Sequence, residues 1–563
     1  MPPYVAAVLV LGFGALIHAS YINNGFTWLD HIDIQQGAAI VAPSGWPAAF
    51  TTRYGDTGFY RPLVTLAHSL DALLYGQEAA GFHLTNVLLH LVVAVSGILF
   101  LTCFFPVEPR ESQLAGLILV AHPLGWLPTG SISYRPELLV GLGTLLAIYF
   151  HTRARRTGDV FRIALTVAAI LVALFSKETA LVWIPCFILL WEVSVPRRSS
   201  STYPLLRKAW PLLVTELGAL VLYVCLRVQA VPETWRVPPL SLSLSQAVGT
   251  RLHVLSGRLL EMVSPLKPGL SDATPIVSME SLSAILCGLI LLLGAGLVFR
   301  LGLRSEWSVA TLFLAVAIAP GANLVPLPRF NSPHYGYLAP VGVAMFVLLT
   351  RRALARKHSR LDEPFKWAVL CWLGVMSIVT FVSGFQFADD QTLFGPEVAR
   401  DTRFLEGHYY LGNYFMDRAQ YDRAGVELEA ALSGSPSVIA YVDRPSALIN
   451  LAGVRLHQSR LAESEELLLE AVGAASEPQL AAIAYNRALV ARERDDYASV
   501  VSLLRERDYR WERPEPWLLL ASALQRVDRT QEAVDALRQA LPLVDEETRR
   551  KLEAFIRSQL NPG

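Results

Sequence analysis

Long apolar runs separated by short polar or basic loops dominate residues 1–390, and they limit what this chain can fold into. A helix that crosses a membrane needs about 20 mostly apolar residues. The whole chain is only 17% charged, against roughly 25% in a typical soluble domain. The sequence therefore predicts an all-α fold with a multi-pass membrane domain over residues 1–390. About eleven segments are expected to span: 4–22, 83–104, 114–133, 136–151, 161–176, 179–194, 210–227, 283–300, 307–323, 335–350 and 366–386.

The distribution of arginine and lysine predicts the orientation. Basic loops occur at 153–162, 197–208, 300–304 and 351–360, and all fall on one side when the spans are counted from residue 4. By the positive-inside rule that side is cytoplasmic. The loops 23–82 and 228–282 and everything after the last span then face outward. The first apolar segment lacks a charged leading region and a cleavage site, so we expect a retained helix.

A second pattern begins at about residue 395, where short amphipathic helices carry small residues at regular spacing. It resembles the tetratricopeptide repeat (TPR), a helical hairpin of about 34 residues. The sequence thus predicts a TPR domain over 395–563, on the non-cytoplasmic side, with a concave surface for a protein partner. A stabilising cap without a partner is the alternative. The repeat residues are Leu411, Gly412, Phe415, Ala424, Leu428, Ala431 and Pro436; Leu451, Ala452, Ser464, Leu468 and Ala471; a degenerate set of Ala488, Tyr497 and Leu504; and Trp517, Leu520, Ala521, Leu524, Ala533, Leu537 and Ala540.

Ionisable residues beside the predicted spans gather at one membrane face. Such residues are costly in a membrane and usually functional. Because the segments were chosen by apolarity alone, agreement in depth and side predicts a single polar cavity. Singly, each residue also has a structural interpretation, such as an interfacial ion pair, a headgroup anchor or a helix cap. The set at the outer face is Asp30, Arg61, Arg135, Glu137, Lys177, Glu178, Arg329 and His334, and His83, Asn86 and His90 share one helical face.

Seven motifs carry a resemblance to a known family: NNGFTWLDH, YRPL, FHLTNVLLH, HP, RPELL, SKET and RFNSPHYGYL. Together with the TPR tail they resemble the GT-C superfamily of membrane glycosyltransferases. Within it they are most similar to the transmembrane-and-TPR proteins linked to protein O-mannosylation and their bacterial counterparts. The family's acidic motif has two adjacent acids, whereas here Asp30 is followed by His31, with Asp33 nearby. This departure keeps the expected base, whereas a second-acid role, including metal binding, is not implied for this sequence.

The resemblance implies transfer of a mannose-like hexose from a polyprenyl-phosphate sugar to a hydroxyl acceptor, such as Ser or Thr of an exported protein, with inversion. A carboxylate can take the acceptor's proton, and Asp30 is the expected base. Cations stabilise the charge on the phosphate leaving group, and the residues expected to do so are Arg61, Arg135, Lys177 and Arg329. The residues expected to bind the sugar or the acceptor are His31, His83, Asn86, Glu137, Glu178, His334 and Tyr335.

No cofactor is expected to be required, because a lipid-phosphate leaving group does not demand a metal; a divalent cation stays an option. The sequence has no cytoplasmic DxD motif, P-loop or GxGxxG, so a nucleotide-sugar enzyme is not expected, and zero net charge does not point to nucleic acid. The five cysteines lack metal-site spacing. The expected partners are the polyprenyl-phosphate sugar, membrane lipid, and an acceptor protein or envelope subunit bound by the TPR domain.

Arginine in large excess over lysine is typical of a GC-rich genome and favours a bacterial inner membrane, with the TPR domain in the periplasm. The main alternative function is a non-catalytic, membrane-anchored TPR scaffold for envelope assembly. A transporter fits less well, because transporters hold their ionisable residues near the midplane. An enzyme whose acceptor is a lipid or a glycan is a further alternative.

Overall fold

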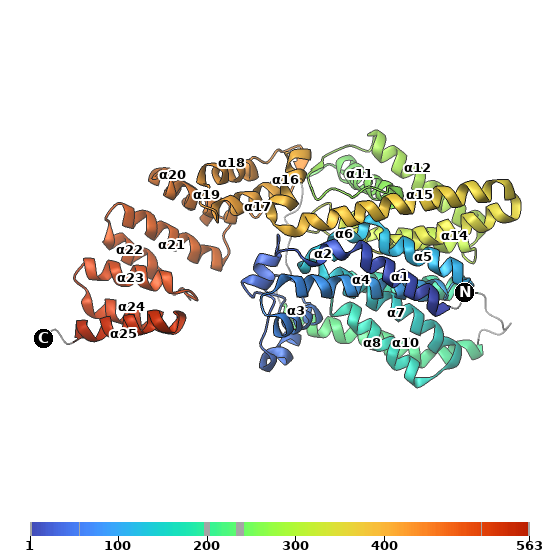
Figure 1. The fold of residues 1–563 in the computed structure, drawn as a ribbon, viewed down its shortest axis with the longest axis horizontal. Helices are drawn as coiled ribbons and strands as arrows, with labels where there is room; N and C mark the ends of the chain where they lie inside the picture. The colour runs from blue at the N-terminus through green and yellow to red at the C-terminus, as the bar shows by residue number, and fades with distance from the viewer. Residues whose placement is uncertain are drawn as a thin grey trace. The chain divides into compact units, whose positions relative to one another are not determined.

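The computed structural model describes residues 3–55, 57–195, 203–231, 241–507, 509 and 511–560, and its regular structure is almost all helix (Figure 1). This confirms the predicted all-α class. The chain divides into two compact units, residues 1–400 with 436–439, and residues 401–435 with 440–563. Within the described residues, the strands are the short β1 (Thr274–Pro275) and β2 (Val438–Ile439), which pair antiparallel with Thr274 opposite Ile439.

The first unit is a bundle in which α4, α5, α7, α14 and α15 run side by side (Figure 1). Its helices are α1 (Pro3–Ile17), α2 (Ala19–Ile22), α3 (Pro62–Tyr75), α4 (Ala79–Leu101), α5 (Pro109–Ala121), α6 (Trp126–Gly130), α7 (Arg135–Thr157), α8 (Val160–Leu174), α9 (Ala180–Ser194), α10 (Tyr203–Ala230), α11 (Leu244–Val263), α12 (Leu282–Leu301), α13 (Glu306–Ile318), α14 (Ala339–Lys357), α15 (Ser359–Gly384) and α16 (Asp390–Arg400).

Four helices in the described part of the chain are long and apolar enough to cross a membrane: α4, Trp210–Ala230 of α10, α12, and Arg360–Ala388 around α15. Others are apolar but shorter. For example, α8 has 15 residues, and at about 1.5 Å per residue it is shorter than the roughly 30 Å hydrocarbon core. The predicted count of eleven spans is therefore not confirmed. Residues 197–202 of the basic loop at 197–208 lie outside the described residues.

The expected continuous helix over 114–133 is wrong, because the chain breaks at His122-Pro123. Helix α5 ends at Ala121, and His122 is extended, with φ −68° and ψ 126°. Proline has no N–H to donate and fixes its own φ. The His122 Nδ1 instead accepts a hydrogen bond from the Leu124 N–H at 3.2 Å. The short helix α6 follows, buried within the first unit.

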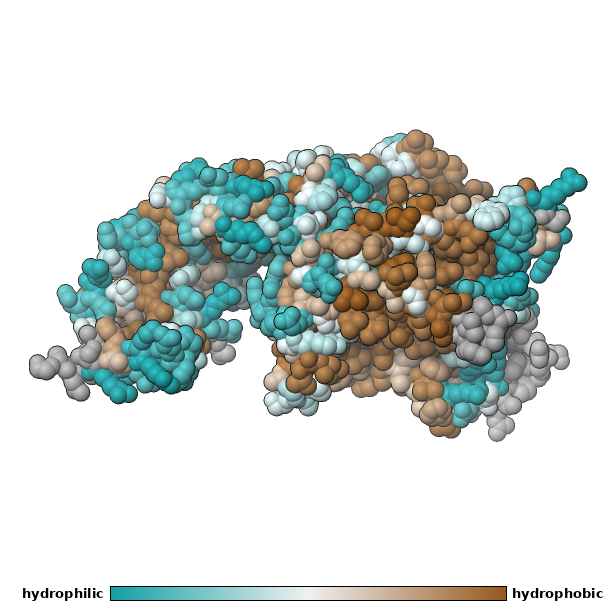
Figure 2. Space-filling view, in the orientation of Figure 1, coloured by the Kyte–Doolittle hydropathy of each residue, from teal (hydrophilic) through white to brown (hydrophobic). Residues whose placement is uncertain are grey.

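The outer surface of the first unit is largely apolar. Figure 2 shows a broad hydrophobic face there, with hydrophilic side chains near its ends. Helix α12 illustrates this surface, since Leu293 is 73% exposed and Phe299 92% exposed. Exposed apolar patches of this extent mark a surface that contacts something other than water. The four long apolar helices are therefore compatible with a membrane protein.

The second unit consists of helical hairpins followed by a last helix, and its visible surface is mostly hydrophilic (Figure 2). Each predicted repeat forms one pair of adjacent helices, including the degenerate third. The helices are α17 (Leu405–Met416), α18 (Tyr421–Leu432), α19 (Arg444–His457), α20 (Leu461–Val472), α21 (Glu477–Glu493), α22 (Tyr497–Arg505), α23 (Pro514–Arg526), α24 (Thr530–Ala540) and α25 (Glu546–Leu560).

The four hairpin turns share one backbone geometry. In each turn a non-glycine residue adopts the left-handed conformation: Ala419, Ser459, Asp495 and Asp528, with φ between 55° and 60°. The next residue's N–H then reaches the carbonyl five residues earlier, as in Gln420 N–H to Phe415 O at 2.9 Å. This is the pattern of a Schellman C-cap, where glycine is the usual left-handed residue.

Gly412 is required where α17 crosses α18. A Cβ at this position would lie 2.6 Å from the Leu428 Cγ. We expect Gly412→Ala to lower the free energy of unfolding by about 1–3 kcal/mol through overpacking. Gly453→Ala on α19 is the matched control, because a Cβ there meets nothing within 4 Å, and it should leave stability equal or slightly higher. Thermal unfolding of the purified full chain checks both; equal melting temperatures for the two variants would contradict the packing argument.

Candidate active site

The loop after α2, which carries Asp30, is tied to the end of α15. The Asn24 side chain donates hydrogen bonds to the carbonyls of Tyr21 and Gly384, both at 2.9 Å. A Cβ on Gly25 would lie 2.6 Å from the Ala388 carbonyl oxygen, so only glycine fits this close approach. The loop therefore has little freedom, and the side chains that follow are held in fixed positions.

Asp30 is fully buried, and its carboxylate accepts hydrogen bonds from neighbouring backbone. Its Oδ1 accepts from the Ser133 N–H at 2.8 Å and from the Ser131 hydroxyl at 3.4 Å. Its Oδ2 accepts from the Thr27 N–H at 3.3 Å. Burial raises the pKa of Asp30 to about 6, although these hydrogen bonds act to lower it. A carboxylate with a pKa near neutrality suits a general base.

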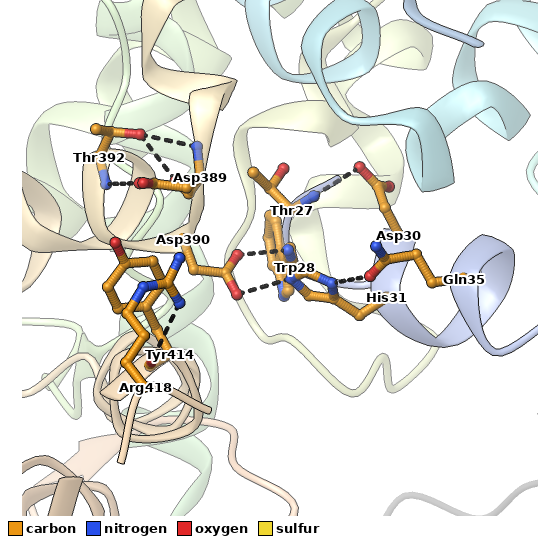
Figure 3. A network of polar contacts seen from close by, with 10 residues as sticks. All are labelled: Thr27, Trp28, Asp30, His31, Gln35, Asp389, Asp390, Thr392, Tyr414 and Arg418. Atoms are coloured by element: carbon orange, nitrogen blue, oxygen red, sulfur yellow. Dashed lines mark hydrogen bonds and ion pairs between the residues drawn. The ribbon is translucent and has the colours of Figure 1, made fainter. Parts of the chain in front are cut away.

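The neighbouring residue, His31, pairs with an acid that is distant in sequence. Its Nε2 donates to Asp390 Oδ2 at 2.9 Å, and the other Asp390 oxygen accepts from the Trp28 N–H at 2.7 Å (Figure 3). Trp28 has the left-handed φ of 59°. Burial acts to lower the pKa of His31, but the hydrogen bond and charge of Asp390 raise it overall to about 9. Sequence reasoning missed Asp390, which lies 359 residues away.

Two ion pairs bring the predicted cations together with the predicted acids. Arg61 donates from Nη2 to Glu178 Oε2 at 3.1 Å and lies over the Phe59 ring, 4.0 Å from its centroid. Lys177 donates to Glu137 Oε1. Because Lys177 and Glu178 are adjacent, the two pairs form one cluster between the end of α8 and the start of α9.

The segment 329–335 joins this cluster to the Asp30 loop. The His334 Nε2 lies 3.5 Å from the same Glu137 oxygen that Lys177 contacts. The Arg329 guanidinium lies over the Trp28 ring, 5.0 Å from its centroid, and the Arg329 carbonyl accepts a hydrogen bond from the Tyr335 hydroxyl at 3.0 Å. One continuous set of contacts thus runs from the loop of Asp30 to Lys177.

Three of the predicted site residues, Arg135, Asn86 and His83, make their hydrogen bonds elsewhere in the bundle core. The fully buried Arg135 pairs through Nη2 with Asp71 Oδ2 at 2.6 Å, and its Nε donates to Asn86 Oδ1 at 2.8 Å. The His83 Nε2 donates to the Gly25 carbonyl at 2.9 Å. Arg135 and Asn86 thus join α3, α4 and α7, whereas His83 joins α4 to the Asp30 loop, and none of these bonds involves the Arg61–Lys177 cluster. Asp71 was also missed, since nothing in the sequence distinguishes it from other acids of an amphipathic helix.

No group of three or more His, Cys, Asp and Glu side chains that could hold a metal ion occurs among the residues that the structure describes. The absence of a metal requirement stays a prediction.

Comparison with known proteins finds relatives over part of the chain. No family model matches it. The chain is 32% identical over 122 residues to human protein O-mannosyl-transferase TMTC3, covering 21% of this chain and 13% of that protein. It is 31% identical over 128 residues to Drosophila melanogaster protein O-mannosyl-transferase Tmtc1, covering 23% and 15%. The matched part is thus about one seventh of each relative's length. These matches confirm the resemblance to transmembrane-and-TPR proteins.

Two solved structures align over most of the chain but with low similarity. They are the APC/C hetero-tetramer Cut9-Hcn1 (TM-score 0.26, 13% identity, 83% of this chain and 92% of that one) and yeast Tom70 (TM-score 0.20, 11% identity, 80% and 92%).

The His31–Asp390 pair predicts a pH-dependent stability. A pKa raised above the ordinary 6.5 stabilises the fold at low pH, and this contribution is lost as pH rises through about 9. We expect the melting temperature of the wild type to fall between pH 6.5 and pH 9, and to fall less in Asp390→Asn. Asp389→Asn is the matched control, since it keeps the partner of His31 and should keep the wild-type slope. Identical slopes in all three proteins would refute the pairing.

Proposed function

We propose that this chain transfers a hexose from a polyprenyl-phosphate sugar to a hydroxyl of an exported protein, with inversion at the anomeric carbon. The observation that carries the proposal is the contact network that joins a buried, near-neutral carboxylate, Asp30, to the cations Lys177 and Arg329. Partial similarity to protein O-mannosyl-transferases supports the reaction class and a mannose-like sugar.

The chemistry needs a base and an anion site. The acceptor oxygen attacks the anomeric carbon while the bond from that carbon to the phosphate oxygen breaks. Asp30 takes the hydroxyl proton, and the electron pair of the broken bond stays on the departing polyprenyl phosphate. Positive groups fixed near that developing charge lower the barrier. Arg61, Lys177 and Arg329 supply them, and Glu178 and Glu137 hold the first two in place.

The acceptor must first reach a carboxylate that is fully buried. The longest of the Asp30 contacts is the one from the Ser131 hydroxyl, at 3.4 Å. An acceptor Ser or Thr hydroxyl can replace this contact with one of the same kind, while the two backbone N–H groups keep the carboxylate in place. His334, Tyr335 and Glu178 remain the proposed contacts to the sugar or acceptor, and Asp390 positions the base through Trp28 and His31.

The location and partners belong to the same proposal. The basic loops favour an outward-facing site, and the excess of arginine over lysine favours a bacterial inner membrane, so we propose that the reaction takes place on its periplasmic side. The second unit, with its hairpin repeats, would bind the acceptor protein or an envelope subunit. The proposed reaction does not require a metal.

A non-catalytic scaffold is the second candidate. Two observations favour it. Both carboxylate oxygens of Asp30 already accept hydrogen bonds from backbone N–H groups, and His31 occupies the position of the family's second acid. In that case the charged cluster would only stabilise the bundle, and the helical repeats would carry the function.

Asp30→Asn should decrease sugar transfer by about 10²–10⁴-fold, because an amide cannot accept the hydroxyl proton. The measurement is transfer of labelled mannose from polyprenyl-phosphate mannose to exported protein, using purified protein in liposomes. Asp33→Asn is the matched control, since the amide oxygen can still accept the hydrogen bond that the Tyr54 hydroxyl donates to Asp33 at 3.0 Å, and it should retain transfer. No transfer by wild type from several sugar donors would favour the scaffold.

The same assay should show a rate that rises with pH through about 6, as the Asp30 carboxyl loses its proton. The rate rises with pH because only the ionised carboxylate of Asp30 can accept the proton. Burial also raises the pKa of Asp33 to about 6, so the Asp33→Asn variant must still show a rise in kcat/KM with pH. A profile that falls through this range, or a rise lost in Asp33→Asn, would exclude Asp30 as the base.

A further inference from the structure

A cavity of about 160 Å³ lies in the first unit between α11, β1 and the segment that carries Asn331. None of the residues that line it has been assigned a role above. Polar side chains form much of its wall: His253, Ser256, Arg258, Glu261, Thr274 and Asn331. At roughly 30 Å³ for each water molecule, the cavity takes about five waters, or one hexose ring in their place.

Arg258 is the most constrained of these side chains. It is only 5% exposed, and its Nη1 lies 2.7 Å from Glu261 Oε2. Its Nε has no hydrogen-bond partner within the described part of the chain, and neither has Asn331 Oδ1. A buried polar atom without a partner costs about 1–3 kcal/mol, so a ligand or solvent that satisfies both atoms is favoured here.

The donors and acceptors in the cavity wall determine which kind of ligand fits. The Arg258 Nε can only donate, whereas the Asn331 oxygen and the Glu261 carboxylate accept. A fully ionised phosphate offers acceptors alone and would meet the Glu261 carboxylate with like charge. Sugar hydroxyls donate and accept at once. The wall therefore fits a neutral, hydroxyl-rich ring better than an anion.

The cavity adjoins the candidate active site. Arg258 and Tyr335 both flank Gly321, where an added Cβ would lie 3.6 Å from the Arg258 Cγ and 3.5 Å from the Tyr335 Cβ. Asn331 follows Arg329, which contacts Trp28, by two residues. A ring held by Arg258 and Asn331 would therefore have the residues of the proposed reaction as its neighbours.

We propose that this cavity binds the hexose ring of the sugar donor, with Arg258, Glu261 and Asn331 hydrogen-bonded to its hydroxyls. That the ring belongs to the donor rests on the proposed function; the binding of a hexose does not. Arg258 and Asn331 would then determine which sugar is accepted, since a site built to hydrogen-bond a hydroxyl rejects sugars that lack it.

The test measures binding of methyl mannoside and methyl glucoside to the purified full chain in nanodiscs, by saturation-transfer NMR. The wild type should bind at least one of them. Asn331→Leu should weaken binding about tenfold, because it leaves a sugar hydroxyl unpaired. Arg258→Lys, which keeps the charge, should also weaken binding. Glu280→Gln is the control, since Glu280 is exposed and does not line the cavity, and it should bind as the wild type does.

Two further measurements extend the test. One asks whether the bound ring is that of the sugar donor, and the other separates the cavity proposal from the proposed transfer reaction. A short-chain polyprenyl-phosphate mannose should displace the methyl hexoside from the wild type; failure to compete would overturn the donor assignment. Asp30→Asn should bind the hexoside normally. No hexoside binding by the wild type, or equal binding by Asn331→Leu, overturns the site and leaves a water-filled cavity. Binding without any transfer would keep the site and remove the proposed function instead.

Discussion

Charged groups buried inside an apolar bundle must be paired, and this requirement organises the ends of the helices in the first unit. A buried charge without a partner costs several kcal/mol. The loops before α3, α7, α9 and α14 and the loop after α2 are therefore tied together by ion pairs and hydrogen bonds, such as Arg61 with Glu178 and Asp30 with the Ser133 backbone. The same contacts that make these loops rigid also bring cations and carboxylates to one region.

Pairing has two different consequences in this bundle. Around Arg135 the partners Asp71, Asn86 and the Phe82 carbonyl leave the guanidinium entirely inside the protein. Around Lys177 the contacts come from two other segments: Lys177 pairs with Glu137 and lies near the Tyr335 ring, and His334 approaches the same Glu137. The first arrangement supports the fold, and the second leaves charge where a phosphate could compete for it. Equal burial therefore does not imply an equal role.

Much of the architecture follows from sequence pattern, but the pairing does not. Apolar runs and small-residue spacing predict helices in the first unit and hairpins in the second, because they reflect local physics. Hydropathy overestimates the length of a helix where an apolar run continues past a break in the helix, as at His122-Pro123. The positions of Arg61, Glu137, Lys177, Glu178 and His334 at the ends of apolar segments predict that they lie near one another, and they do. The same pattern also predicts Arg135 there, but Arg135 pairs with Asp71 instead. Partners such as Asp71, Asp390 and Arg258 depend on tertiary contacts between distant segments, and no local pattern marks them.

The left-handed turns of the second unit affect how its hairpins depend on one another. A non-glycine residue in this conformation costs roughly 1 kcal/mol, and the four turns repeat that cost at Ala419, Ser459, Asp495 and Asp528. A hairpin with a strained turn is less stable alone, so more of its stability comes from stacking on its neighbours. The array is therefore expected to unfold as a cooperative block, and a single hairpin cut from it would be a poor independent unit.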